Sequence, residues 1–306
     1  MKVLNVSKLP AELPVELYIQ EDSYFPAYGG GSKARKIAPF LEEAESFGCN
    51  AIVTAGAANS NHARVVALAC AQKRWKCTVV VHDIEDYSKA NLLLMKLAGA
   101  KLVFSSLSEV GAVMDEEMES FRQSGHNLYY IYGGGHALPG YYAYYQAALQ
   151  LVEEHPELKP DYIVHASGTG GTQAGLVVGC EQVLPGAKVV GVSIARNHTR
   201  GFEAVSNACW ELTEHLGIKS VENSKVLFKD DWIGGGYGKA FPQLIQAIRK
   251  FSQEYGLITD PTYTGKALHG LVAMVKSGEI EPGSKVLFWH TGGLTNLFEH
   301  TQKFIE

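Results

Sequence analysis

Short apolar segments alternate with segments of helical spacing along most of the chain, and this order constrains the fold more than any other feature. Ala-Ile-Val-Thr-Ala at 51–55 is typical of a buried strand, and residues 61–74 follow with apolar positions at helical spacing. We expect strands at 51–55, 77–82, 101–104, 128–131, 162–166, 188–193 and 285–289, and helices at 61–74, 91–98, 110–122, 172–182, 241–255 and 266–276. Strands joined by helices of this length form parallel sheets with right-handed crossovers. The sequence therefore predicts an α/β fold.

The strand–helix order runs in two series, which a polar, proline-broken stretch at 155–157 separates. We therefore predict two open parallel-sheet α/β domains with a ligand cleft between them. The limits that we expect are 46–155 for a smaller domain, and 1–45 together with 156–306 for a larger, cofactor-binding one. The N-terminal stretch contains several prolines and lacks the strand–helix order, so we expect it to wrap around the larger unit.

Composition and charge exclude several functional classes. The 306 residues include 19% charged side chains and carry a net charge of −5, with no basic block of the kind that binds nucleic acid. No apolar run is long enough to cross a bilayer, and the start lacks the apolar region of a signal peptide, so we expect a cytoplasmic protein. Five cysteines without a C-x-x-C pair indicate neither a disulfide framework nor a zinc site, and we expect no metal.

A lysine at the start of a helix follows three glycines in the segment 29–36, Gly-Gly-Gly-Ser-Lys-Ala-Arg-Lys. Cationic side chains are unfavourable in the first turn of a helix, so Lys33 and Lys36 together call for an anionic partner. Burial and neighbouring positive charge would keep the Lys33 amine nucleophilic. Lys33 taken alone is more typical of a solvated surface charge, and only its surroundings favour a chemical role.

A turn of small residues joins a buried strand to a helix at 167–175, Ser-Gly-Thr-Gly-Gly-Thr-Gln-Ala-Gly. A dinucleotide loop would be followed by an acidic residue near the end of the next strand, and 189–194 contains none. A single phosphate fits better, unless the turn is only structural. The expected phosphate ligands are Gly168, Thr169, Gly170, Gly171 and Thr172. An amine nucleophile and a phosphate site together predict pyridoxal 5′-phosphate held by Lys33 as a Schiff base, with Lys36 among the cofactor-binding residues.

Further candidate residues lie in loops that follow the strands. One of Ser60 and Asn61 is expected to cap a helix, while Asn61 could donate to the cofactor ring and Ser60 could hold a substrate carboxylate. His62 is more typical of a structural residue than a catalytic one, and we place it with the substrate-binding residues. Tyr237 and Tyr263 stand in glycine- and proline-containing loops, where each alone is more often a packing residue.

The two tyrosines together could supply hydroxyls for proton transfer, so we place Lys33, Ser60, Tyr237 and Tyr263 in the catalytic set. Thr291 follows the last expected strand and could reach the ring nitrogen of the cofactor. In this interpretation Lys33 removes or relays the Cα proton of a small amino-acid substrate. A homodimer is the default expectation for a soluble assembly.

In this order, the motifs resemble the D-cysteine desulfhydrase and 1-aminocyclopropane-1-carboxylate deaminase family, pyridoxal-phosphate enzymes of the tryptophan synthase β-subunit type. The resemblance covers nearly the whole chain. Five family motifs have counterparts here. They are G-G-N-K-x-R-K at 30–36, Q-S-N-H at 59–62, the phosphate loop at 169–172, the Tyr-Gly pair at 237–238 and D-P-x-Y-x-G-K at 260–266. The resemblance implies the tryptophan synthase β-like fold and a Schiff base on Lys33.

Two positions help to separate the activities of this family. The cyclopropane deaminases carry Glu after the D-P-x-Y tyrosine and Leu before the final Gly-Gly, where this chain has Thr264 and Thr291. The resemblance therefore favours β-elimination from D-cysteine, which yields pyruvate, ammonia and sulfide. Ser32 replaces the family's Asn and Asn59 replaces its Gln, and the tyrosine-rich segment 132–145 is expected to border the cleft.

These departures leave other functions open. Within the enzymes, the alternatives are 1-aminocyclopropane-1-carboxylate deamination, and β-elimination or β-replacement on another amino acid. Outside the enzymes, the alternative is a non-catalytic protein that binds a phosphorylated ligand in the same cleft.

Overall fold

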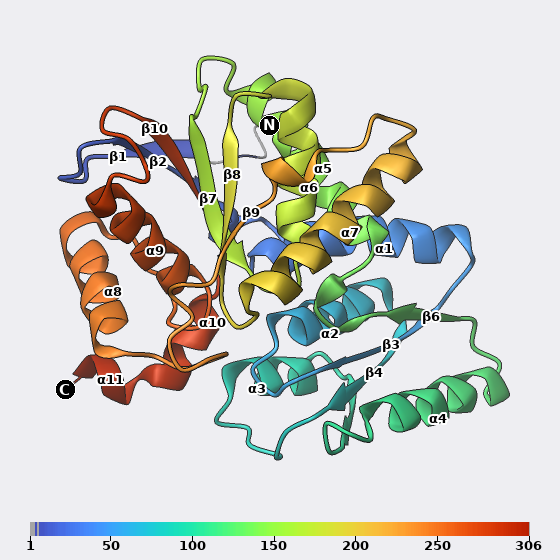
Figure 1. The fold of residues 1–306 in the computed structure, drawn as a ribbon. Coiled ribbons are helices and arrows are strands. Elements are labelled where there is room, and N and C mark those ends of the chain that lie inside the picture. Colours follow the sequence, from blue (N-terminus) through green and yellow to red (C-terminus); the bar gives the residue numbers. More distant parts are fainter. Residues whose placement is uncertain (1–3, 5, 306) are drawn as a thin grey trace.

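Two sheets form the framework of the computed structural model, which describes residue 4 and residues 6–305 (Figure 1). The larger sheet has the order β1 (Val6–Leu9), β2 (Glu16–Glu21), β10 (Lys285–His290), β7 (Tyr162–Ser167), β8 (Lys188–Ser193) and β9 (Leu227–Lys229). The smaller has the order β5 (Lys101–Phe104), β4 (Lys76–Val81), β3 (Ala51–Gly56) and β6 (Leu128–Ile131). All pairs are parallel except β1 with β2. The predicted α/β class with two parallel sheets is confirmed.

Helices cover both sheets. The helices associated with the smaller sheet are α2 (Asn61–Lys73), α3 (Ala90–Leu97) and α4 (Val110–Gln123). Those of the larger sheet are α5 (Leu138–Glu154), α6 (Gly171–Val183), α7 (His198–Leu216), α8 (Pro242–Tyr255) and α9 (Thr264–Ser277). The remaining helices are α1 (Ser32–Ser46), α10 (Leu294–Leu297), α11 (Gln302–Ile305) and the 3-10 turns η1 (Asp22–Tyr24), η2 (Gly133–Gly135), η3 (Asn223–Lys225) and η4 (Phe298–His300).

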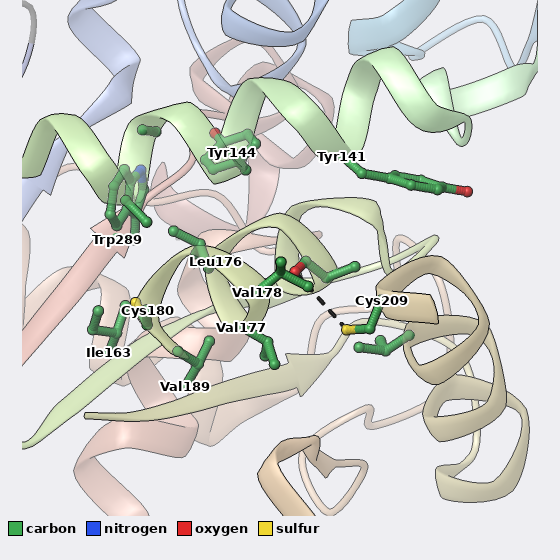
Figure 2. Packing of buried hydrophobic residues seen from close by; sticks show 14 of the residues in the cluster. Tyr141, Tyr144, Ile163, Leu176, Val177, Val178, Cys180, Val189, Cys209 and Trp289 are labelled. Carbon is green, nitrogen blue, oxygen red and sulfur yellow. Dashed lines mark hydrogen bonds between the residues drawn. The ribbon is translucent and has the colours of Figure 1, made fainter. Parts of the chain in front are cut away.

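Helices α5 and α6 pack against each other (Figure 2). Their close approach depends on small residues on the facing side of α6. A Cβ on Gly175 would lie 2.3 Å from the Tyr141 carbonyl oxygen, and one on Gly179 would lie 2.5 Å from the Ala148 Cβ. Side chains larger than hydrogen would therefore push the two helices apart. Tyr144 of α5 and Trp289 of β10 complete this core, with ring centroids 5.9 Å apart.

The prediction that the N-terminal stretch wraps around the larger unit is wrong. Residues 6–9 and 16–21 form β1 and β2, and β2 lies inside the sheet between β1 and β10. Leu17 and Ile19 are buried and point to one face, which is the period-two pattern of a strand. The expectation about a signal peptide concerns residues 1–5, of which only Leu4 belongs to the described residues.

Two helices lie across the junction between the sheets. Helix α1 contributes Ile37 and Phe40 to the core cluster beside the smaller sheet, whereas α5 contributes Tyr144 and Leu151 to the cluster beside the larger one. The predicted domain limits are 46–155 and 1–45 plus 156–306, and they assign α1 to the larger domain and α5 to the smaller one. Each of these helices therefore packs in the core of the domain to which the limits do not assign it. The limits themselves stay a prediction. Every helix in the described residues is too short or too polar to span a bilayer.

Candidate active site

A cavity of about 590 Å³ lies where the carboxyl ends of strands from both sheets meet. Ligand sites of α/β proteins form in this position, because the loops that follow parallel strands converge there. The cavity is lined by the start of α1, by the loop after β3, by the loop after β7 and by the loop after β10. Of the predicted site residues, the lining includes Lys33, Lys36, Ser60, Asn61, His62, Gly168, Thr169, Gly170, Thr172, Tyr237, Tyr263 and Thr291.

The three glycines before α1 make its position possible. Gly29, Gly30 and Gly31 all have positive φ, at 78°, 71° and 87°. A Cβ on Gly30 would lie 2.0 Å from the Ser23 carbonyl oxygen, so the loop folds back on η1 only with glycine there. The backbone N–H of Ser32 donates to the Thr291 carbonyl at 2.8 Å, which brings Lys33 beside the loop after β10.

A buried carboxylate, that of Asp22, also holds α1 in place. Asp22 is fully buried and accepts hydrogen bonds from Arg35 Nη2 at 2.5 Å, Tyr144 Oη at 2.5 Å and Trp289 Nε1 at 2.8 Å. These donors hold the pKa of Asp22 below its usual value despite its burial. Asp22 therefore ties α1 to α5 and β10, and Arg35 adds no unpaired charge to the site.

Unlike Arg35, Lys33 and Lys36 are not paired with a carboxylate. Burial lowers the pKa of Lys33 to about 8, and burial together with the neighbouring Lys33 lowers that of Lys36 well below its usual value. Neither ammonium has a salt-bridge partner among the residues that the structure describes, and no Asp or Glu of those residues lines the cavity. Buried cations without a partner are costly, so the site is built for an anion.

The loop after β7 provides the matching anion site. Gly170 has φ of 97° and turns the chain into α6, whose first backbone N–H groups have no partner within the helix. The hydroxyl of Ser167 is buried, lines the cavity and has no hydrogen-bond partner in the described structure. A Cβ on Gly171 would lie 3.4 Å from Lys36 Nζ, which places this ammonium at the loop. These donors fit a phosphate group.

One of Ser60 and Asn61 was predicted to cap a helix, and Ser60 is that cap. Its Oγ accepts the backbone N–H of Ala63 at 3.2 Å, at the start of α2. His62 lines the cavity, but its Nε2 donates to Thr54 Oγ1 at 3.0 Å, since the Thr54 hydroxyl donates in turn to the Ile131 carbonyl. Burial lowers the pKa of His62 to about 3, so its ring is neutral at physiological pH. A role for His62 in substrate binding stays a prediction.

Tyr237 and Tyr263 lie in contact, with their hydroxyl oxygens 2.5 Å apart and their rings edge to face. Burial raises the pKa of both phenols, so both are protonated at neutral pH. Asp260 fixes the loop that carries Tyr263 by accepting the backbone N–H groups of Thr262, Tyr263 and Thr264. The sequence motif therefore has a structural basis in a buried carboxylate.

Lys266 fixes the loop that carries Tyr237. Its side chain is fully buried, and Nζ donates to the carbonyls of Ile194, Ile233 and Gly236 at 3.2, 2.7 and 2.7 Å. The three N–H groups of the ammonium are thus all used within the protein. Burial lowers the pKa of Lys266 to about 8. Sequence reasoning missed this role because the carbonyl partners lie far from Lys266 in the chain.

The prediction that the tyrosine-rich segment 132–145 borders the cleft is confirmed in part. Gly133 and Gly134 line the cavity, but none of the segment's tyrosines does. Tyr144 is instead buried against Asp22. Sequence reasoning also missed Arg64, Arg196 and Ser167, together with an apolar wall; the members of that wall are Leu107, Val110, Met114 and Tyr130.

The sequence model of one protein family, described as pyridoxal-phosphate dependent enzyme, matches residues 2–292. The chain belongs to this family. It is 34% identical to the "Putative 1-aminocyclopropane-1-carboxylate deaminase" of Pyrococcus abyssi, over 98% of this chain and 91% of the relative. It is 30% identical to the D-cysteine desulfhydrase of Klebsiella pneumoniae, over 96% of this chain and 91% of the relative.

Solved structures confirm the tryptophan synthase β-like fold predicted from sequence. A crystal structure of a 1-aminocyclopropane-1-carboxylate deaminase homologue has a TM-score of 0.91 and 32% identity, and the match covers 100% of this chain and 94% of that one. The fold is also that of an O-ureido-L-serine synthase, with a TM-score of 0.70, 16% identity, and coverage of 97% of this chain and 91% of that one. The protein is therefore a pyridoxal-phosphate-dependent enzyme of the deaminase and desulfhydrase group.

Proposed function

We propose that the enzyme catalyses β-elimination from D-cysteine and releases pyruvate, ammonia and sulfide. The lining of the cavity carries this proposal, because no described Asp or Glu belongs to it. Thr291 lines the cavity, and the hydroxyl of Thr264 is turned away to Asp260 and the Gly292 carbonyl. The carboxylate and the leucine of the cyclopropane deaminase pattern are thus both absent from these two positions.

The residues present fit pyridoxal phosphate. Lys33 would hold it covalently, Asn61 would contact the ring, and Thr291 would face the ring nitrogen. The phosphate ligands would be Lys36, Ser167, Gly168, Thr169, Gly170, Gly171 and Thr172. When bound, the cofactor supplies an electron sink for the charge that develops at the substrate Cα.

The other residues of the proposed site act on the substrate itself. Once the incoming substrate has freed it, Lys33 Nζ takes the Cα proton, and its lowered pKa keeps part of the free amine unprotonated near pH 8. Ser60 and the neighbouring backbone N–H groups hold the substrate carboxylate at the start of α2. Because the hydroxyls of Tyr237 and Tyr263 share one hydrogen bond, one of their two protons is left to face the cavity. That proton goes to the leaving thiolate.

The decisive experiment supplies pyridoxal phosphate to the purified protein and measures sulfide, pyruvate and ammonia with four substrates: D-cysteine, L-cysteine, D-serine and 1-aminocyclopropane-1-carboxylate. The proposal predicts sulfide and pyruvate in equal amounts from D-cysteine, and loss of turnover in K33A. Ammonia and 2-oxobutyrate from the cyclopropane acid alone would move the enzyme to the deaminase group. Cofactor binding without any turnover would leave a different amino acid as substrate or a non-catalytic role.

Assembly and location are part of the same proposal. We expect a homodimer, which size-exclusion chromatography with light scattering would test. All five cysteines are free and buried, which supports the reducing interior of the cytoplasm.

A further inference from the structure

The loop between β3 and α2 is held by residues from the opposite end of the chain. Thr295 and Asn296 belong to α10, more than 230 positions after Asn61, and both are hydrogen-bonded to its side chain. We infer that Thr295 and Asn296 are positioning residues that present Asn61 to the cavity as a hydrogen-bond donor. The inference rests on the proposed function only in taking Asn61 as a cofactor contact.

The direction of the hydrogen bonds around Asn61 follows from Arg64. A guanidinium can only donate, and Arg64 Nη1 donates to Thr295 Oγ1 at 3.1 Å and to Asn91 Oδ1 at 3.3 Å. The Thr295 hydroxyl therefore gives its own proton to Asn61 Oδ1, at 2.8 Å. Asn91 must turn its Nδ2 toward the same oxygen, at 3.0 Å.

Two donors thus occupy both lone pairs of Asn61 Oδ1. The Asn61 Nδ2 donates one of its two N–H groups to Asn296 Oδ1 at 2.5 Å, and Asn296 Nδ2 donates to the Asn59 carbonyl at 3.1 Å. The second N–H of Asn61 has no acceptor among the described residues. Because Asn61 lines the cavity, this N–H is the part of the side chain that a ligand meets.

Burial makes this arrangement rigid. Asn296 is fully buried, and Arg64 is 4% exposed. A flipped amide at position 61 would set Nδ2 against the donors of Thr295 and Asn91, which is costly away from water. The cluster also connects the two sheets, because α10 follows β10 of the larger sheet while Asn61 and Arg64 belong to α2 beside the smaller one. Arg64 Nη2 also donates to the Gly30 carbonyl, at 3.4 Å, in the loop before Lys33. A nearby ion pair at 2.5 Å joins Lys89, the residue before α3, to Glu299 of η4.

The test replaces Thr295 by Val, which keeps the shape of the side chain and removes its hydroxyl. T295S restores the hydroxyl, and T301V is a matched control in the same C-terminal segment, where Thr301 Oγ1 donates to the Phe298 carbonyl. The dissociation constant of pyridoxal phosphate is measured on the apo-protein by fluorescence titration. The pH midpoint of the visible absorbance is measured on the loaded protein. Neither measurement needs a substrate.

We expect T295V to raise the dissociation constant of pyridoxal phosphate by about tenfold, since one hydrogen bond of this kind is worth about one factor of ten. The absorbance midpoint should move up by about one pH unit, because a donor to a charged ring oxygen favours its deprotonated form. T295S and T301V should match the wild type in both measurements. A purely structural role would lower the melting temperature and leave the midpoint unchanged.

The inference is overturned if T295V, or T295A should T295V fail to fold, changes neither the dissociation constant nor the midpoint. It is also overturned if T295S behaves like T295V. Failure of the proposed function gives a different result. The wild-type protein would then bind pyridoxal phosphate, and T295V would still shift the dissociation constant and the pH midpoint of the absorbance, but D-cysteine would remain unchanged.

Discussion

Replacing Lys266 by Met tests whether a buried ammonium holds the loop of Tyr237. The variant keeps most of the side-chain volume and removes three charge-assisted hydrogen bonds to the carbonyls of Ile194, Ile233 and Gly236. Each such bond is worth about 1.5–3 kcal/mol. The cost of burying the charge, seen in a pKa lowered from 10.5 to about 8, offsets about 3 kcal/mol at neutral pH. We therefore expect K266M to lower the free energy of unfolding by about 1.5–6 kcal/mol.

The assay is urea denaturation of the apo-protein at pH 7, with K276M on the exposed end of the same helix as the matched control. Hydrogen exchange of residues 233–238 should accelerate in K266M and stay unchanged in K276M. The sign of the pH dependence follows from linkage. Between about pH 8 and 10.5 the unfolded state binds more protons at Lys266 than the folded state, so this group adds stability as pH rises. The difference in stability between wild type and K266M should therefore grow by about 2 kcal/mol from pH 7 to 10.

Two results would refute the reasoning about Lys266. One is a K266M protein whose free energy of unfolding lies within about 0.5 kcal/mol of wild type, which is the range of an ordinary surface substitution. The other is a difference between wild type and K266M that shrinks as the pH rises.

Three further predictions concern the cofactor site. K33M should stabilise the apo-protein by about 1–3 kcal/mol at pH 7, because it removes a partly buried, unpaired charge whose pKa is lowered. Equal or lower stability in urea denaturation would contradict this. G171A should weaken pyridoxal-phosphate binding by at least about tenfold, because the added Cβ would lie 2.8 Å from the Tyr141 ring. An unchanged affinity in a fluorescence titration would show that the loop adapts and would contradict this prediction. Y263F should lower kcat for D-cysteine by about a hundredfold and leave cofactor affinity unchanged, because it removes one of two paired hydroxyls; an unchanged kcat would remove Tyr263 from the proton path.

Much of the fold could be read from the sequence because the buried parallel strands are short apolar runs between helical segments. The strand at 51–56 and the helix at 61–73 were predicted to within two residues. Strand β2 was missed because Glu16, Tyr18 and Gln20 interrupt its apolar positions, and prolines flank it. Helix α5 was missed because its tyrosines suggested a cleft wall, although Tyr144 is held inside by Asp22.

Some residues of the candidate site could be predicted from local sequence motifs, and others could not. Lys33 and the proposed phosphate loop stand in contiguous glycine-rich segments, so local sequence patterns alone were enough to propose a Schiff base and an anion site there. Thr295, Asn296 and Arg64 act through partners distant in sequence, and no local motif marks them. Lys266 belongs to a recognised motif, but its three carbonyl acceptors come from two other segments of the chain. Such roles depend on tertiary contacts, which a sequence pattern does not contain.

The role of Lys33 is tested by loading the protein with pyridoxal phosphate, reducing it with borohydride and locating the modified residue by peptide mass mapping. Reduction fixes the cofactor to the amine that holds it. We expect the added mass on Lys33. A modified Lys36 or Lys266 in its place, or no modified lysine in protein that has bound the cofactor, would contradict it.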